Sequence, residues 1–289
     1  MSLGFASYPL GSFVELMDKL EYVLPNLPKQ EARGAQYMLL NVNTLGPETG
    51  KSLAIRVGVA EITVGRLMRR LGYNGTKDFK ELLRQHYAVG GNTGAPQHDL
   101  APHLRQTLEA EISAIRNVFD QTTGKHWDKA SELVSQSSSI FVTGFQSVRG
   151  LAKDFSVRLG LARPNVHYLS PHDGMLGEWI MPDQASSATE CLVLVDVVPY
   201  AKEAPELIRI SKEQGRKCIV VSDEFCHWSH DLADAVIYAP SITGLYLEST
   251  IGINIALSLL TDVAARKDAN ISSQRLEWWK KNSRRLNLF

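Results

Sequence analysis

Three arginines lie close together in the segment GVAEITVGRLMRRLGYNG, residues 58–75. Its apolar residues follow the i, i+3, i+4, i+7 spacing of one buried helix face: Val64, Leu67, Met68 and Leu71. Because a helix advances about 100° per residue, another set points the opposite way: Ile62, Arg66, Arg69 and Tyr73, flanked by Thr63 and Arg70. Guanidinium groups bind phosphates and guanine edges, so this face predicts an anionic partner. A solvated surface helix is the simpler alternative.

The charge around this helix is asymmetric, although the whole chain has a formal net charge of zero. Between residues 50 and 84 there are eight basic residues and three acidic ones, a local net charge of +5. The basic residues are Lys51, Arg56, Arg66, Arg69, Arg70, Lys77, Lys80 and Arg84. A local excess of this kind predicts a local anionic partner rather than a uniformly basic protein.

A second short helix is expected just before it, in TGKSLAIRVGV at residues 49–59. Leu53, Ala54 and Val57 would face inward, and the small Ala54 allows two helices to approach closely. Gly58 can adopt the positive φ of a tight turn. Two helices joined by such a turn, with basic side chains on the second, have helix-turn-helix geometry, which places the second helix in the DNA major groove.

The pattern therefore predicts a domain that binds a double-stranded DNA operator. The residues expected to meet base edges are Glu61, Ile62, Thr63 and Arg66, and those expected to hold phosphates are Lys51, Arg69 and Arg70. One such domain buries little surface, so we expect a homodimer or homotetramer that reads two half-sites.

The run SLAIRVGVAEITVGRLMRRLGYNGTKDFKELL resembles the N-terminal domain of RpiR-type bacterial transcription regulators. The matching positions are Thr63, Val64, Arg66, Arg70, Leu71, Gly72, Tyr73, Gly75, Asp78, Phe79 and Lys80. One departure is Ala60, which stands where the family has a capping Ser. Its loss removes a helix cap worth about 1 kcal/mol, while Glu61 in the first turn still complements the helix dipole.

Composition and hydrophobic periodicity divide the chain into four parts. We expect an all-α helix-turn-helix domain at 1–87 and a Gly-, Pro- and Asn-rich linker at 88–101. An α/β domain is expected at 102–270, followed by a basic tail at 271–289 that contains Trp278 and Trp279. In the α/β part, apolar runs at 140–144, 165–169, 191–196, 217–223 and 235–240 alternate with helical stretches. This rhythm predicts a three-layer domain with a five-stranded parallel sheet.

The same alternation of strands and helices resembles that of the sugar isomerase (SIS) domain that RpiR-type regulators carry. In that family, Ser- and Gly-rich turns after two strands cradle a sugar phosphate. Here the first turn reads Gly144-Phe145-Gln146-Ser147-Val148, and the second, at 196–201, has no Ser, Gly or Thr. Asp196 would place a negative charge where the family holds phosphate.

The residues available for an effector at the carboxyl ends of the strands are Gly144, Gln146, Ser147, Arg149, His172, Asp196, Tyr200, Ser222 and Asp223. They predict a sugar derivative that is less anionic than a sugar phosphate, or one with an amine or several hydroxyls. The alternative is that the cradle has decayed and the domain serves only for oligomerisation.

No catalytic residues are predicted, because HExxH, GxSxG and GxxxxGK[ST] motifs are missing from the sequence. A sugar-phosphate isomerase or another phosphosugar-binding enzyme with an accessory helical domain remains the alternative function. The three scattered cysteines, Cys191, Cys218 and Cys226, show no metal-ligand spacing. We therefore expect neither metal nor cofactor, no membrane segment, and a cytoplasmic location.

Overall fold

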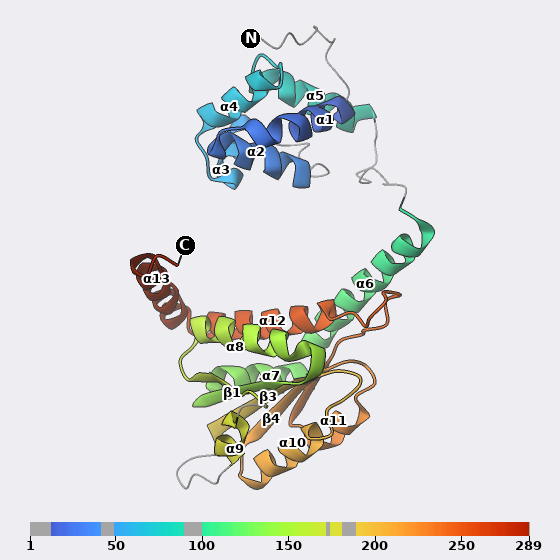
Figure 1. The fold of residues 1–289 in the computed structure, drawn as a ribbon, viewed down its shortest axis with the longest axis vertical. Coiled ribbons are helices and arrows are strands. Elements are labelled where there is room, and N and C mark those ends of the chain that lie inside the picture. Colours follow the sequence, from blue (N-terminus) through green and yellow to red (C-terminus); the bar gives the residue numbers. More distant parts are fainter. Residues whose placement is uncertain (1–12, 42–48, 90–99, 172–173, 181–188, 289) are drawn as a thin grey trace. The chain divides into compact units, whose positions relative to one another are not determined.

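The computed structural model describes residues 13–41, 49–89, 100–171, 174–180 and 189–288. The chain divides into two compact units, residues 1–99 and 100–289, and each is described by itself (Figure 1).

The first unit consists of helices in its described residues. These are α1 (Phe13–Val23), the short 3-10 turn η1 (Leu24–Asn26), α2 (Lys29–Leu40), α3 (Gly50–Val57), α4 (Glu61–Arg70) and α5 (Thr76–Val89). Their inward residues form one core, which includes Leu16, Leu20, Met38, Leu53, Val64, Leu67, Met68 and Phe79. The core fixes α4 against α2 and α3, because each helix contributes one apolar face to it.

Helix α3 is capped at both ends. The Thr49 side chain accepts a hydrogen bond from the Ser52 N–H (3.1 Å), and the Thr49 N–H donates back to Ser52 Oγ (2.7 Å). At the other end Gly58 is left-handed, with φ 69°, and Arg33 Nη2 donates to the Val57 carbonyl (2.8 Å). A left-handed residue without a Cβ turns the chain directly into α4.

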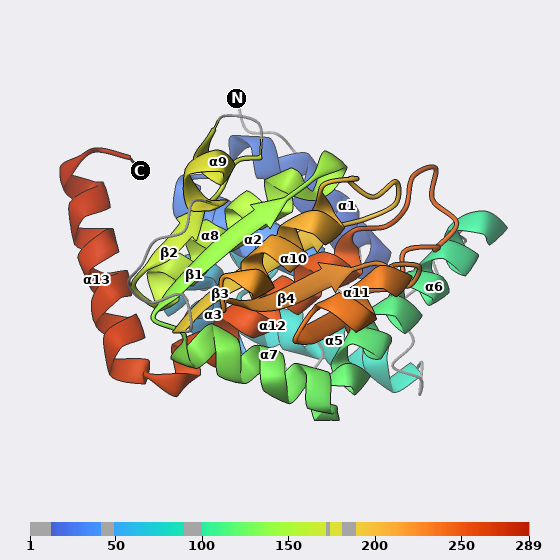
Figure 2. The same cartoon turned by 90° about the horizontal axis from the view of Figure 1, so that it is seen from below.

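The second unit contains a five-stranded parallel sheet with strand order β2-β1-β3-β4-β5. Its strands are β1 (Ser139–Gly144), β2 (Val166–Tyr168), β3 (Glu190–Asp196), β4 (Lys217–Ser222) and β5 (Ala235–Tyr238). The middle of β3 pairs on both sides, with Val142↔Val193 and Val193↔Ile219 in register. Figure 2 shows β1, β3 and β4 side by side. Since β3 and β4 are buried on both faces, they read as nearly continuous apolar runs.

Helices cover both faces of this sheet (Figure 1). One layer is built from α6 (Pro102–Asp120), α7 (Lys125–Gln136), α8 (Arg149–Ala162) and α12 (Ile251–Lys267). The other is built from α9 (Met175–Ile180), α10 (Ala204–Glu213) and α11 (His227–Leu232). The last helix, α13 (Ala269–Arg285), is tied to α8, since Arg275 Nε donates to the Gly160 carbonyl (3.0 Å).

The structure confirms the predicted fold class, a helical first part followed by a three-layer α/β part with five parallel strands. Some details differ. Residues 88 and 89 end helix α5 instead of beginning a linker, and most of the predicted tail is the helix α13. The apolar helix α12 buries Ile253, Leu257 and Leu260 in the core of its own unit.

Tyr73 was predicted on the exposed face of the second helix and is buried instead. Helix α4 ends at Arg70, and Gly72 takes a left-handed φ of 91°. The helical period therefore no longer applies at Tyr73, and the reversed chain returns its ring to the core. None of the described helices has the length and apolar character needed to cross a membrane.

Candidate nucleic-acid interface and ligand pocket

Helix α4 separates its residues cleanly into a core face and a solvent face. Val64, Leu67 and Met68 are buried, while the residues Glu61, Ile62, Arg66, Arg69 and Arg70 are exposed and Thr63 is half-buried. Ile62 leaves 61% of its surface exposed although it is a large apolar residue. An apolar side chain among arginines at the start of a helix is suited to contact a thymine methyl beside phosphates and guanine.

The N-terminus of α4 lacks a side-chain cap. Ala60 is the N-cap residue and makes no side-chain hydrogen bond, whereas its carbonyl accepts from the Thr63 N–H (2.9 Å). Glu61 occupies the first turn, where a negative charge complements the helix dipole. The structure therefore confirms that helix α4 begins without the side-chain cap that a Ser at position 60 would supply.

Arg70 differs from the other two arginines because it has a partner inside the unit. Its Nε donates to Glu31 Oε2 at 2.6 Å, and the Glu31 side chain is almost fully buried. About half of the Arg70 side chain is still exposed. Arg70 thus neutralises a buried carboxylate of α2 and also presents charge at the surface.

More basic residues flank α4 on the neighbouring helices. Lys51 of α3 is exposed, as are Arg56, Lys77 and Lys80. Lys51 is the second residue of α3, so its position follows from the Thr49 cap and from the packing of Leu53. The exposed surface of this unit therefore carries several cationic side chains around α4, the kind that contact phosphates in protein–DNA complexes.

In the second unit, the polar residues predicted from sequence gather at the carboxyl ends of β1, β3 and β4. The strand order reverses direction between β1 and β3, which is where open α/β sheets bind ligands. A cavity of about 420 Å³ lies there, lined by Phe145, Gln146, Arg149, Pro171, Leu176, Ala201 and Glu203. Its size is in the range of small-molecule sites.

The turn after β1 forms one wall of this cavity. A Cβ on Gly144 would lie 2.5 Å from the Ala152 Cβ, so glycine is needed there to let α8 approach the sheet. Gln146 has φ 49°, a left-handed conformation that costs a residue with a side chain on the order of 1 kcal/mol. Gln146, Ser147 and Arg149 are all exposed at this turn.

The loop after β3 is held by two buried carboxylates. Asp196 Oδ1 accepts from the Val197 N–H (3.1 Å) and its Oδ2 accepts from the Ala201 N–H (3.0 Å). Asp223 Oδ2 accepts from the Val198 N–H (2.7 Å), and its Oδ1 accepts from the Tyr200 hydroxyl. Ser222 Oγ donates to the Asp196 carbonyl (2.6 Å). These hydrogen bonds therefore fix the conformation of the loop after β3.

Burial perturbs the acid–base properties of this cluster. Removal from water, with a smaller contribution from the nearby Asp223, raises the pKa of Asp196 to about 7 against the lowering effect of the Ala201 and Val197 N–H groups. Burial and the hydrogen bond to Asp223 also raise the pKa of the Tyr200 phenol.

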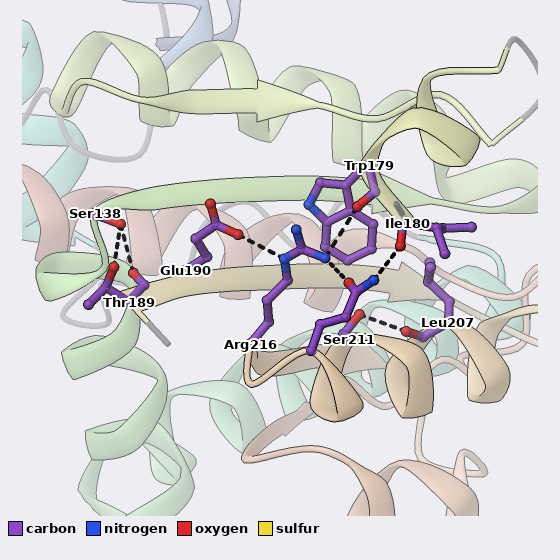
Figure 3. Close-up of polar contacts among 9 residues, drawn as sticks. Ser138, Trp179, Ile180, Thr189, Glu190, Leu207, Ser211 and Arg216 are labelled. Carbon is purple, nitrogen blue, oxygen red and sulfur yellow. Dashed lines mark hydrogen bonds and ion pairs between the residues drawn. The ribbon is translucent and has the colours of Figure 1, made fainter. Parts of the chain in front are cut away.

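Helix α9, which contributes Leu176 to the cavity, is anchored at its last turn (Figure 3). Arg216 Nη1 donates to the Trp179 carbonyl (3.2 Å), and the guanidinium lies 4.4 Å from the centre of the Trp179 ring. Glu190 Oε2 accepts from Arg216 Nε (2.8 Å), so the buried cation is neutralised. Gln214 donates to the Ile180 carbonyl, and it also pairs with Arg216.

Of the eight predicted ligand residues that the structure describes, only Gln146 and Arg149 line the cavity. Gly144, Asp196, Ser222 and Asp223 are buried and are not among the residues that line it, and the last three make hydrogen bonds that hold the loop after β3. Ser147 and Tyr200 lie in its two bordering loops, while His172 and the neighbouring Asp173 lie outside the described residues.

Sequence reasoning missed the other cavity residues, Phe145, Pro171, Leu176, Ala201 and Glu203. For Glu203 a signal was present, because it directly precedes the helical run that begins at Ala204 and so had to lie at a strand-to-helix turn. The apolar residues carry no such signal. Among the described residues, no cluster of His, Cys, Asp and Glu has the arrangement of a metal site.

Known proteins resemble this chain over most of its length. It is 22% identical over 239 residues to the HTH-type transcriptional regulator HexR of Escherichia coli, which covers 81% of each chain. It is 21% identical to the HTH-type transcriptional regulator CPE0189 of Clostridium perfringens, covering 86% of this chain and 90% of the other. The chain is a homologue of HTH-type transcriptional regulators. No protein-family model matches it.

Solved structures share the fold of this regulator homologue. The Vibrio vulnificus NanR protein, solved as a complex with ManNAc-6P, aligns with a TM-score of 0.52 and 16% identity over 94% of this chain and 98% of that one. The sugar isomerase domain of an RpiR transcription factor from Sphaerobacter thermophilus aligns with a TM-score of 0.52 and 17% identity, over 61% of this chain and 97% of that one. The second unit of this chain therefore has the fold of an SIS domain, and a helical unit precedes it in the sequence.

Proposed function

We propose that this protein is a sequence-specific DNA-binding transcription regulator that controls carbohydrate-related genes in response to a small sugar derivative. The observation that carries the proposal is the solvent face of α4, where Ile62, Arg66 and Arg69 are exposed on a helix fixed by a buried core. The relatives, which are transcription regulators, support the same reading.

The residues have separate roles in the proposed complex. Glu61, Ile62, Thr63 and Arg66 stand in the first turns of α4 and would reach base edges in the major groove. Lys51, Arg69 and Arg70 would contact phosphates and fix the register of the helix. Arg70 does so in addition to its ion pair with Glu31.

Selection of bound sequences from a random duplex library tests these roles. The wild-type chain should enrich one operator motif. Arg66→Ala should relax the preference at one position and cost about 1–3 kcal/mol on the selected operator, whereas Arg69→Ala should weaken binding to all sequences alike. If selection with the wild-type chain enriches no sequence motif in the library, sequence-specific binding is refuted.

We also propose that the protein acts as a homodimer or homotetramer in the cytoplasm. A single helix-turn-helix unit contacts one half-site, and a symmetric pair of units reaches specificity by reading two. Sedimentation equilibrium of the full chain should return a multiple of 32.1 kDa. A mass that stays monomeric at every concentration would contradict this part of the proposal.

The effector would bind in the cavity between the β1 turn and the loop after β3. Gln146 and Arg149 supply hydrogen-bond donors there and Glu203 supplies an acceptor. We propose a binding role without turnover. The test is to incubate the chain with sugar phosphates and follow isomerisation by chromatography, for which we expect no product above the uncatalysed level.

A further inference from the structure

The loop after β3 directs its backbone N–H groups to carboxylates of the protein itself. The Val197 and Ala201 N–H groups donate to Asp196, and the Val198 N–H donates to Asp223. Pro199 has no N–H to offer. Ala201 lines the cavity, so an anionic ligand that reached this wall would find the Ala201 N–H already occupied by Asp196.

The start of α10 continues the same acidic wall. A helix N-terminus ordinarily attracts phosphate through its free N–H groups and its dipole. Here Glu203 is the N-cap residue of the ten-residue helix α10, and its exposed side chain lines the cavity. A phosphate ester carries a charge of about −1.5 to −2 at pH 7, so this carboxylate repels it at the position that would otherwise bind it.

The opposite wall has the complementary character. Gln146 and Arg149, at the start of α8, present amide and guanidinium donors to the cavity. A ligand that spans both walls must donate to Glu203 and accept from Gln146 and Arg149. Hydroxyl groups do both, and a cavity of about 420 Å³ accommodates one small polyhydroxylated molecule.

We infer that Asp196, Asp223 and Glu203 determine specificity by making this cavity select small unphosphorylated sugars over their phosphate esters. Asp196 occupies the Ala201 N–H at the cavity wall, Asp223 occupies the Val198 N–H of the same loop, and Glu203 adds a charge that repels a phosphate. The inference rests on the proposed effector function of this cavity and names its ligand class.

The direct test is calorimetric titration of the full chain with matched pairs of sugars: hexoses, hexosamines and hexitols, each with its 6-phosphate. We expect at least one unphosphorylated member to bind, with an affinity at least tenfold above that of its phosphate. A phosphate ester that binds more tightly than its parent would overturn the inference, and so would the failure of every sugar to bind. DNA binding measured on the same sample without sugar reports separately on the proposed regulator function.

Two variants show which residues produce the discrimination. Glu203→Gln, at an exposed position, should reduce the preference for the unphosphorylated sugar at least threefold. Glu206→Gln, on the same helix but paired with Arg209 (2.9 Å), should leave it unchanged. Equal ratios in Glu203→Gln and wild type would contradict the assignment of Glu203.

Asp196→Ser should free the Val197 and Ala201 N–H groups and thereby create an anion site. Inorganic phosphate should raise the melting temperature of this variant by at least 2 °C and leave that of the wild type unchanged, with circular dichroism as the check of folding. A wild-type chain that phosphate stabilises equally would contradict the role of Asp196. If Asp196→Ser does not fold, the inference is tested by the ratio of sugar to sugar-phosphate affinity in Glu203→Gln.

Discussion

Asp196 shows how sequence can place a residue in the fold without revealing its contacts. Its position at the end of a buried strand was predicted, and so was its proximity to the ligand site. The structure buries the carboxylate completely and bonds it to its own loop. Sequence could not reveal this, because the contact joins Asp196 to an N–H five residues away in a loop without periodicity.

The pKa of Asp196, raised to about 7, predicts a pH-dependent stability. The usual pKa of an Asp in an unfolded chain is about 3.9, so between about pH 4 and pH 7 the folded state binds more protons than the unfolded state. The free energy of unfolding should therefore fall as the pH rises through this window, by up to roughly 1.4 kcal/mol per pH unit. Urea unfolding at several pH values measures it.

The control for this effect is Asp196→Asn, which keeps the shape but does not titrate. Its stability should vary less than that of the wild type between pH 4 and pH 7, and the difference between the two curves isolates the carboxyl. If the free energy of unfolding varies with pH in the same way in both proteins, Asp196 does not have the raised pKa.

Arg70 and Arg69 are adjacent in sequence and should respond differently to substitution. Arg70→Ala leaves Glu31 buried without its cation, which should cost about 1–2 kcal/mol of stability, because half of the Arg70 side chain is in solvent. Arg69→Ala should stay within about 0.5 kcal/mol, as expected of an exposed residue. Thermal unfolding of both variants measures the contrast, and equal losses would contradict it.

At the scale of elements, periodicity predicted most of the molecule. The elements α3, β1 and β3 lie within one or two residues of the ranges expected from the sequence, whereas α4 ends at Arg70, three residues before Tyr73, which the helical spacing had assigned to it. The C-terminal helix α13 was missed, because its mixture of Trp, Lys and Arg lacks a clear apolar stripe. It folds against α8 through Arg275 and Gly160, a contact between residues far apart in the chain.

Helix α6 and the segment 241–249 form another long-range pair that the sequence did not reveal. Glu111 of α6 is buried and accepts from Thr243 Oγ1 (2.8 Å) and Ser249 Oγ (2.9 Å). Glu111→Ala should leave both hydroxyls without this acceptor and cost about 1–3 kcal/mol. Hydrogen exchange should then accelerate in residues 241–249.

The matched control is Glu109→Ala, which removes an exposed carboxylate from the same helix. We expect its stability to lie within about 0.5 kcal/mol of the wild type, and its exchange at 241–249 to be unchanged. Similar acceleration in both variants would indicate loosening of α6 as a whole and would refute the specific role of Glu111.

At the scale of the whole molecule, two units of different chemistry are joined in one chain. The first exposes arginines on a helix that its core holds in place, and the second places a small cavity at the point where strand order reverses. Composition alone concealed this division, because the basic excess around α4 is balanced elsewhere to a net charge of zero. The combination supports the proposal of a regulator in which effector binding to the second unit is linked to DNA binding by the first.

The most direct test of the central claim is the salt dependence of binding to duplex DNA from the promoter region next to the gene of this protein. Fluorescence anisotropy should show an affinity that falls linearly on a log–log plot against salt concentration. Arg69→Ala should reduce the magnitude of the slope by about 1, as expected for one lost phosphate contact. Binding that is undetectable, or that is independent of salt in the wild type, would contradict the assignment of α4 as a DNA-binding helix.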